Sequence, residues 1–145
     1  MFERILVAVD GSDGALAALD LAVQIQGKCG SEILILCVYR HYSLLEASMS
    51  MVRPSEPENL DDSMREYAGS VVESAKKFAQ DHGAKKVRGF VKSGQPARTI
   101  VGFAKEKGAS LIVVGSRGLG DIEGYLLGSV SHKVTSLAEC PVLVV

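Results

Sequence analysis

The fold is decided by the stretch of residues 111–129, which reads LIVVGSRGLGDIEGYLLGS. Its first four residues form a short apolar run that is typical of a buried strand. Glycines follow at positions 115, 118, 120, 124 and 128, and a short amphipathic segment begins at Ser129. The pattern predicts a strand, a glycine-rich loop and a helix, which together form one repeating unit of a parallel α/β sheet.

The same alternation extends outward along the chain. Further apolar runs lie at residues 5–9, 33–39, 87–91 and 142–145. Helical patterns separate them: one follows Ser12 and ends at Gly27 and Gly30, one covers residues 60–78 and ends near Gly83, and one starts at Pro96 and ends near Gly108. We therefore predict one α/β domain, residues 1–145, with a doubly wound sheet of five parallel strands.

Two segments depart from this regular pattern. Arg88 and Gly89 interrupt the strand at 87–91, which suits the edge of the sheet better than its centre. Residues 41–58 contain Pro54 and Pro57, and we predict one long loop or a partly helical excursion there. Its apolar side chains either cover a pocket or dimer contact or form a docking surface for a partner.

Composition excludes several classes of protein. The 145 residues are 47% hydrophobic and 23% charged, and 16 Lys and Arg against 17 Asp and Glu give a net charge of -1. This balance argues against a nucleic-acid partner. No apolar run is long enough to span a membrane, so we expect no membrane insertion. The N-terminus lacks the features of a signal peptide, and a cytoplasmic location is the expectation.

Reactive side chains are few and scattered. The cysteines Cys29, Cys37 and Cys140 have no metal-binding spacing, and we expect reduced thiols packed as small hydrophobic residues. No HExxH, GxSxG or CxxC pattern occurs. We predict no catalytic residue.

The glycine-rich loop suits a phosphate group. Glycine lets the backbone approach a ligand closely, and the first amides of a helix favour negative charge. Ser129, Val130 and Ser131 would supply such amides. The alternative is a surface loop whose glycines only make turns. The spacing matches neither the P-loop nor the dinucleotide fingerprint.

The spacing Gly115-x2-Gly118-x9-Gly128-Ser129 resembles the G-x2-G-x9-G-[ST] motif of the ATP-binding universal stress proteins. Residues 5–12, 94–96 and 140–144 also resemble that family's first strand, a pre-helix turn and its closing strand. The resemblance implies a Rossmann-like fold of the adenine nucleotide alpha hydrolase-like type. It further implies the strand order 3-2-1-4-5, a homodimer and bound ATP, with Mg as the accompanying metal.

The resemblance also implies a role for each matching residue. Asp10 would bond the ribose or lie near the phosphate-bound metal, although an Asp at this place is also a common helix cap, a role for which Ser12 competes. The backbone of Val38 would meet the adenine edge. The implied site residues are Ala8, Asp10, Val38, Gly115, Arg117, Gly118, Gly128, Ser129, Val130 and Ser131.

The function that follows from the resemblance is a nucleotide-sensing regulatory protein of the stress response. Its homodimer would form through the closing strand, Val142 to Val145, because an uncovered apolar edge strand invites pairing. Residues 41–54 resemble family members associated with bacterial tripartite solute transporters, which suggests a transporter as partner. Any activity is expected to be at most slow ATP hydrolysis or self-phosphorylation, with Ser129 or Ser131 as the acceptor. A slow ATPase, a self-phosphorylating enzyme and a variant that prefers AMP or a cyclic nucleotide remain alternatives.

Overall fold

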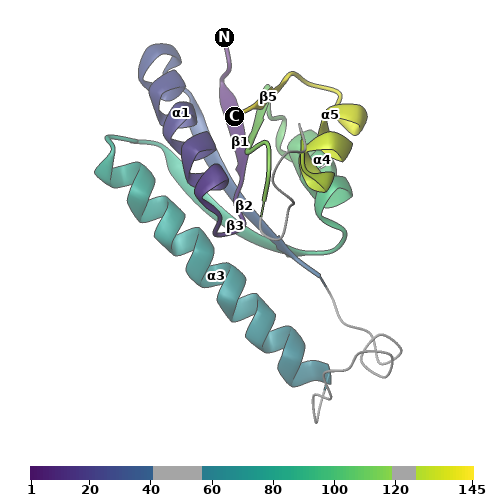
Figure 1. Ribbon diagram of the computed structural model, residues 1–145. Helices are drawn as coiled ribbons and strands as arrows, with labels where there is room; N and C mark the ends of the chain where they lie inside the picture. Colours follow the sequence, from purple (N-terminus) through teal and green to yellow (C-terminus); the bar gives the residue numbers. More distant parts are fainter. Residues whose placement is uncertain (41–56, 119–126) are drawn as a thin grey trace.

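The computed structural model describes residues 1–40, 57–118 and 127–145, and its strands form one parallel sheet (Figure 1). The strands are β1 (Arg4–Ala8), β2 (Glu32–Tyr39), β3 (Val87–Ser93), β4 (Leu111–Val114) and β5 (Val142–Val144). Their order is β3-β2-β1-β4-β5, and all neighbouring pairs are parallel. This confirms the predicted fold class and strand order, with β3 at one edge.

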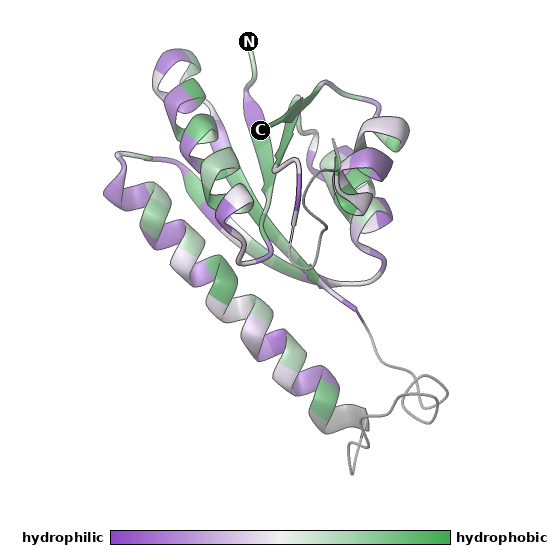
Figure 2. Ribbon diagram, in the orientation of Figure 1, coloured by the Kyte–Doolittle hydropathy of each residue, from purple (hydrophilic) through white to green (hydrophobic). Residues whose placement is uncertain are grey.

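The helices cover both faces of the sheet. They are α1 (Asp13–Cys29), α3 (Pro57–Asp81), α4 (Pro96–Lys107) and α5 (Ser129–Leu137). Helices α1 and α3 lie on one face, and α4 and α5 lie on the other (Figure 1). The strands are mostly hydrophobic along their length, as Figure 2 shows, because both of their faces are covered.

Alternating strand residues supply the two cores. Ile5 and Ile35 pack toward α1 and α3, while Leu6 and Leu34 pack toward α4 and α5. All four side chains are fully buried. Successive side chains of a strand point to opposite faces, so the continuous apolar runs of the sequence serve both layers at once.

The helix ends follow from local chemistry. Ser12 caps α1, its Oγ accepting the N–H of Ala15 at 3.2 Å, and Gly30 ends that helix at a φ of 69°. Gly27 lies inside α1 rather than at its end. Helix α3 begins at Pro57, inside the segment 41–58 for which the sequence predicts a long loop or a partly helical excursion, because Pro fits the first position of a helix. Residues 41–56 lie outside the described part of the chain.

The three cysteines differ in exposure. Cys37 is buried and Cys140 is partly buried, but Cys29 is exposed at the end of α1, so the prediction that all three pack as hydrophobic residues is wrong for Cys29. All three thiols are free.

Within residues 1–40, 57–118 and 127–145, no helix has the length and apolar character needed to cross a membrane.

A buried amide ties the end of α1 to the neighbouring strands. Gln26 is 7% exposed; its Nε2 donates to the carbonyl of Ser31 at 2.9 Å and to that of Lys86 at 3.2 Å, and its Oε1 accepts the N–H of Lys85 at 3.2 Å. We expect Gln26→Leu to lower the free energy of unfolding by about 2 kcal/mol, because buried main-chain groups lose their partners.

Urea denaturation measures this loss of stability. Gln24→Leu is the matched control on the same helix, because Gln24 is exposed and bonds only the neighbouring Asp20 among the hydrogen bonds described. We expect its effect to stay within about 0.5 kcal/mol. Equal stability of the two variants would contradict the role given to Gln26.

Candidate functional site

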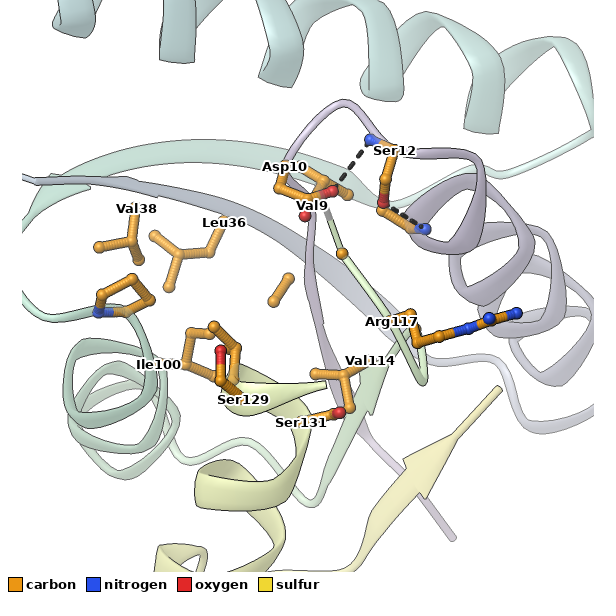
Figure 3. Close-up of a pocket in the computed structure, with 16 residues that line it drawn as sticks. Val9, Asp10, Ser12, Leu36, Val38, Ile100, Val114, Arg117, Ser129 and Ser131 are labelled. Carbon is orange, nitrogen blue, oxygen red and sulfur yellow. Dashed lines mark hydrogen bonds between the residues drawn. The ribbon is translucent and has the colours of Figure 1, made fainter. Parts of the chain in front are cut away.

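A cavity of about 270 Å³ opens at the carboxyl ends of β1, β2 and β4 (Figure 3). The chain runs from β1 to β2 on one side and returns to β4 on the other, so the strand order reverses at this point. Doubly wound sheets bind their ligands at such a reversal. The lining residues are Ala8, Val9, Asp10, Ser12, Ala15, Leu36, Val38, Pro96, Ile100, Val114, Gly115, Arg117, Gly118, Ser129, Val130 and Ser131.

The structure brings the site residues predicted from the sequence into this one lining, with a single exception. Gly128 is buried at the N-cap of α5, and its N–H donates to the carbonyl of Ser116. Arg117 belongs to the lining, but its side chain is exposed and extends away from Asp10 and Ser129 in Figure 3. Gly120 and Gly124 lie outside the described residues.

One end of the cavity is apolar. Leu36 and Val38 of β2 lie together there in Figure 3. Ala8, Ile100 of α4 and Val114 of β4 add further apolar side chains to the lining, with Val114 close to Ser131 in Figure 3. Leu36, Ile100 and Val114 are not among the site residues predicted from the sequence. Leu36 could have been found from Val38, because residues two apart on a strand share a face. Ile100 needed the fold, since only the packing of α4 on the sheet brings it to β2.

The acidic turn after β1 forms the polar wall. The N–H of Ser12 donates to Oδ1 of Asp10 at 2.9 Å, and Ser12 in turn caps α1. Gly11, between them, has a φ of 88°, which glycine adopts without strain. Ser12 therefore holds the cap for which it competed with Asp10, and the Asp10 carboxylate is fixed beside the cavity.

A buried thiol lies near this carboxylate. Burial, together with the negative charge of Asp10, raises the pKa of Cys37 to about 11. Cys37 is 5% exposed and packs in the core under α1 and α3. It stays a neutral thiol at physiological pH and leaves Asp10 as the charged group on this side of the cavity.

Helix α5 begins at the opposite wall. Ser129 is exposed, whereas Ser131 is only 3% exposed and its Oγ lies 2.9 Å from the carbonyl oxygen of Ser116 and 3.1 Å from that of Gly128. This hydroxyl ties α5 to the end of β4. The first amides of α5 carry the positive end of the helix dipole and lie at the lining. His132 is exposed and does not contribute to the lining.

The side chains at the cavity suit a divalent cation only when a bound ligand supplies further oxygen atoms. Within the described residues, no group of three or more His, Cys, Asp or Glu side chains could hold a metal ion. Asp10 is the acidic side chain among the lining residues described. Hard cations such as Mg²⁺ bind through one or two carboxylates together with substrate phosphates, and Asp10 fits that arrangement.

Comparison with known proteins identifies the family. The model of the universal stress protein family matches residues 1–145. The chain belongs to the universal stress protein family. Among curated members of that family, Universal stress protein YxiE of Bacillus subtilis is 41% identical over 149 residues, which cover 100% of this chain and 99% of the relative. Universal stress protein MJ0531 of Methanocaldococcus jannaschii is 35% identical, covering 100% of this chain and 82% of the relative.

Solved structures share the fold. The hypothetical protein MJ0577 superposes with a TM-score of 0.83 at 30% identity, covering 100% of this chain and 96% of its own. A universal stress protein in complex with cAMP has a TM-score of 0.72 at 29% identity, covering 99% of this chain and 96% of its own. These likenesses support the sheet topology described above and show that one similar universal stress protein binds an adenine nucleotide.

Proposed function

We propose that this universal stress protein binds an adenine nucleotide, with ATP as its main ligand, and acts as a nucleotide-dependent regulator of the stress response. The observation that carries the proposal is the two-sided character of one cavity. The apolar side chains of Leu36 and Val38 lie on one side of it, and Ser129 and Ser131 at the start of α5 lie on the other. An adenine nucleotide has the same division between a flat base and a charged phosphate chain.

Different residues would contact the base, the phosphates and the ribose. The base lies between Ala8 of β1 and Val38 of β2, with the main chain of Val38 at its edge. The phosphates lie against Gly115 and Gly118 and accept hydrogen bonds from the amides of Ser129, Val130 and Ser131. Asp10 bonds the ribose or holds a Mg²⁺ ion on the phosphates. When bound, that ion neutralises phosphate charge.

Titration of ligands into nucleotide-free protein tests the proposal. Isothermal titration calorimetry with ATP, AMP, cAMP and adenosine separates the base from the phosphates. We expect ATP to bind at least about tenfold more tightly than adenosine, since charge-assisted hydrogen bonds contribute about 1.5–3 kcal/mol. If AMP or cAMP binds more tightly than ATP, that nucleotide is the main ligand in place of ATP, and the assignment of the site stands. Absence of binding by all four would contradict the proposal.

Replacing the carboxylate of Asp10 tests its role. We expect Asp10→Asn to weaken ATP binding in the presence of Mg²⁺ about tenfold and to make ATP binding nearly independent of Mg²⁺. The amide oxygen of Asn still accepts the N–H of Ser12, so the turn is kept while the charge is lost. Calorimetry with and without Mg²⁺ measures both effects.

Asp13→Asn is the matched control, because Asp13 is exposed in the first turn of α1 and does not belong to the cavity lining. It removes the same charge a few residues away. Unchanged Mg²⁺ dependence in Asp10→Asn would show that Asp10 has no part in holding the metal.

Binding is a better description of this site than catalysis. Self-phosphorylation needs an exposed acceptor, and Ser131 is buried with its hydroxyl against two carbonyl oxygens. Ser129 is exposed at the lining, but among the described residues no group of three or more His, Cys, Asp or Glu side chains could hold a metal ion beside it. We therefore propose a regulator whose nucleotide is bound rather than rapidly turned over.

The regulator would act as a homodimer in the cytoplasm. Strand β5 is the outer strand of the sheet next to β4, and an uncovered edge offers main-chain groups to a second copy. A membrane transporter is the proposed protein partner, from the resemblance of residues 41–54 to transporter-associated members. That segment lies outside the described residues.

A further inference from the structure

The main chain of α1 meets the main chain of the loop after β4 through two glycines, Gly14 and Gly115. A Cβ atom added at Gly115 would lie 2.8 Å from the carbonyl carbon and oxygen of Gly14 and 3.2 Å from the nitrogen of Ala15. A Cβ atom added at Gly14 would lie 2.8 Å from the carbonyl oxygen of Arg117. The distances of 2.8 Å are too short for a carbon atom, so neither position has room for a side chain unless the main chain shifts.

This lack of space is particular to Gly14 among the helical glycines described. Gly27 on the same helix, Gly69 on α3 and Gly102 on α4 have no atom within 4 Å of an added Cβ. Glycine is costly inside a helix, because alanine forms helix better. At position 14 the close approach of a second main chain explains why glycine is present in spite of this cost.

Both sides of this contact belong to the candidate site. Ser12 and Ala15, on either side of Gly14, line the cavity, and so do Gly115, Arg117 and Gly118. Gly14 itself does not belong to the lining. The contact therefore lies behind the cavity wall and joins the acidic turn to the loop proposed to hold phosphate.

The contact also sets the orientation of a peptide group. The carbonyl of Arg117 faces Gly14 of α1. In a trans peptide the N–H of the next residue points the opposite way, so the amide of Gly118 is turned away from α1. Helix α1 cannot easily shift to change this, because Ala15, Ala18 and Leu19 are buried in the core. The rigid helix therefore holds the more exposed loop peptide in place.

We propose that Gly14 is a positioning residue for the phosphates of the bound nucleotide: its missing side chain lets the Arg117–Gly118 peptide rest against α1 with its amide turned from the helix. The proposal rests on the function proposed above. A side chain at position 14 displaces that peptide and tilts the loop that the phosphates contact. The base slot, formed by strand ends and α4, is untouched.

Gly14→Ala tests the proposal, with Gly27→Ala as the matched control on the same helix. Calorimetry measures the affinity of each variant and of the wild type for ATP and for adenosine. We expect Gly14→Ala to bind ATP about tenfold more weakly and adenosine within about twofold of the wild type, because only the phosphate contacts are disturbed. Gly27→Ala keeps both affinities, since an added methyl group there meets open space.

The ratio of the two affinities decides the outcome. If Gly14→Ala keeps the preference of the wild type for ATP, the inference is overturned and the proposed function stands. Equal losses for ATP and adenosine also overturn it, because they indicate a general distortion. A wild type that binds adenosine as tightly as ATP overturns the proposed phosphate site itself.

A measurement on the wild type covers the case in which Gly14→Ala does not fold. The amide resonance of Gly14 is followed by NMR during titration with ATP and then with adenosine. We expect ATP to shift it strongly and adenosine to shift it little, while the amide of Gly27 stays unchanged with both. A Gly14 resonance that responds equally to the two ligands overturns the inference.

Discussion

Ala8→Phe is expected to weaken the binding of both ATP and adenosine by at least about a hundredfold while the protein stays folded. Ala8 is the last residue of β1, lines the cavity and packs against the core beneath α4 and α5. Its small side chain leaves the apolar end of the cavity open. A phenyl ring in the same direction occupies the space of the base, so the base loses its contacts with Val38 and Ile100.

The control for this substitution enlarges the side chain only slightly. Ala8→Ser adds one hydroxyl group and leaves the cavity open, so we expect adenosine affinity within about fivefold of the wild type. Calorimetry gives the affinities, and thermal unfolding shows that each variant is folded. If Ala8→Phe binds adenosine as well as the wild type does, the base lies elsewhere and the assignment of the apolar end is wrong.

The strands and helices could be predicted from the sequence because their signals are local. Apolar runs such as residues 111–114 must be buried on both faces, and Ser12 and Gly30 carry the chemistry of a helix start and end. The order of the strands has no such local signal, since periodicity does not say which strands are neighbours. It came from the family resemblance, and the observed sheet confirms it.

The candidate site was predictable only in part, for the same reason. Glycine spacing and the acidic turn at Asp10 are visible in the sequence, and the structure places Gly115, Gly118 and Asp10 at one cavity. Ile100 gave no signal, because an apolar helical residue looks the same whether it faces a core or a ligand. Gly14 gave none either: its neighbour Arg117 is distant in the chain, and only the fold brings their main chains together.

The main-chain N–H and C=O groups of successive residues in β5 point alternately toward β4 and toward the open edge of the sheet, and this leads to the second large expected effect. The N–H of Ile112 donates to the carbonyl of Pro141 at 3.0 Å, and the N–H of Val145 donates to the carbonyl of Val114 at 2.9 Å. Positions 141 and 145 therefore face β4. Main-chain groups of a strand alternate between its two sides, so those of Val142 and Val144 face the open edge. These are the groups that a second copy would pair with.

Val144→Pro should convert the proposed homodimer into a monomer. Proline removes the outward N–H and places a ring at the edge, but it spares the bonds to β4, and edge strands accept proline where the N–H faces outward. A two-fold axis doubles the loss, so we expect the dissociation constant of the dimer to rise about a hundredfold or more. Light scattering coupled to size-exclusion chromatography measures the mass. Val144→Ile, which keeps the N–H and an apolar side chain, should stay dimeric, and a dimeric Val144→Pro would place the interface away from β5.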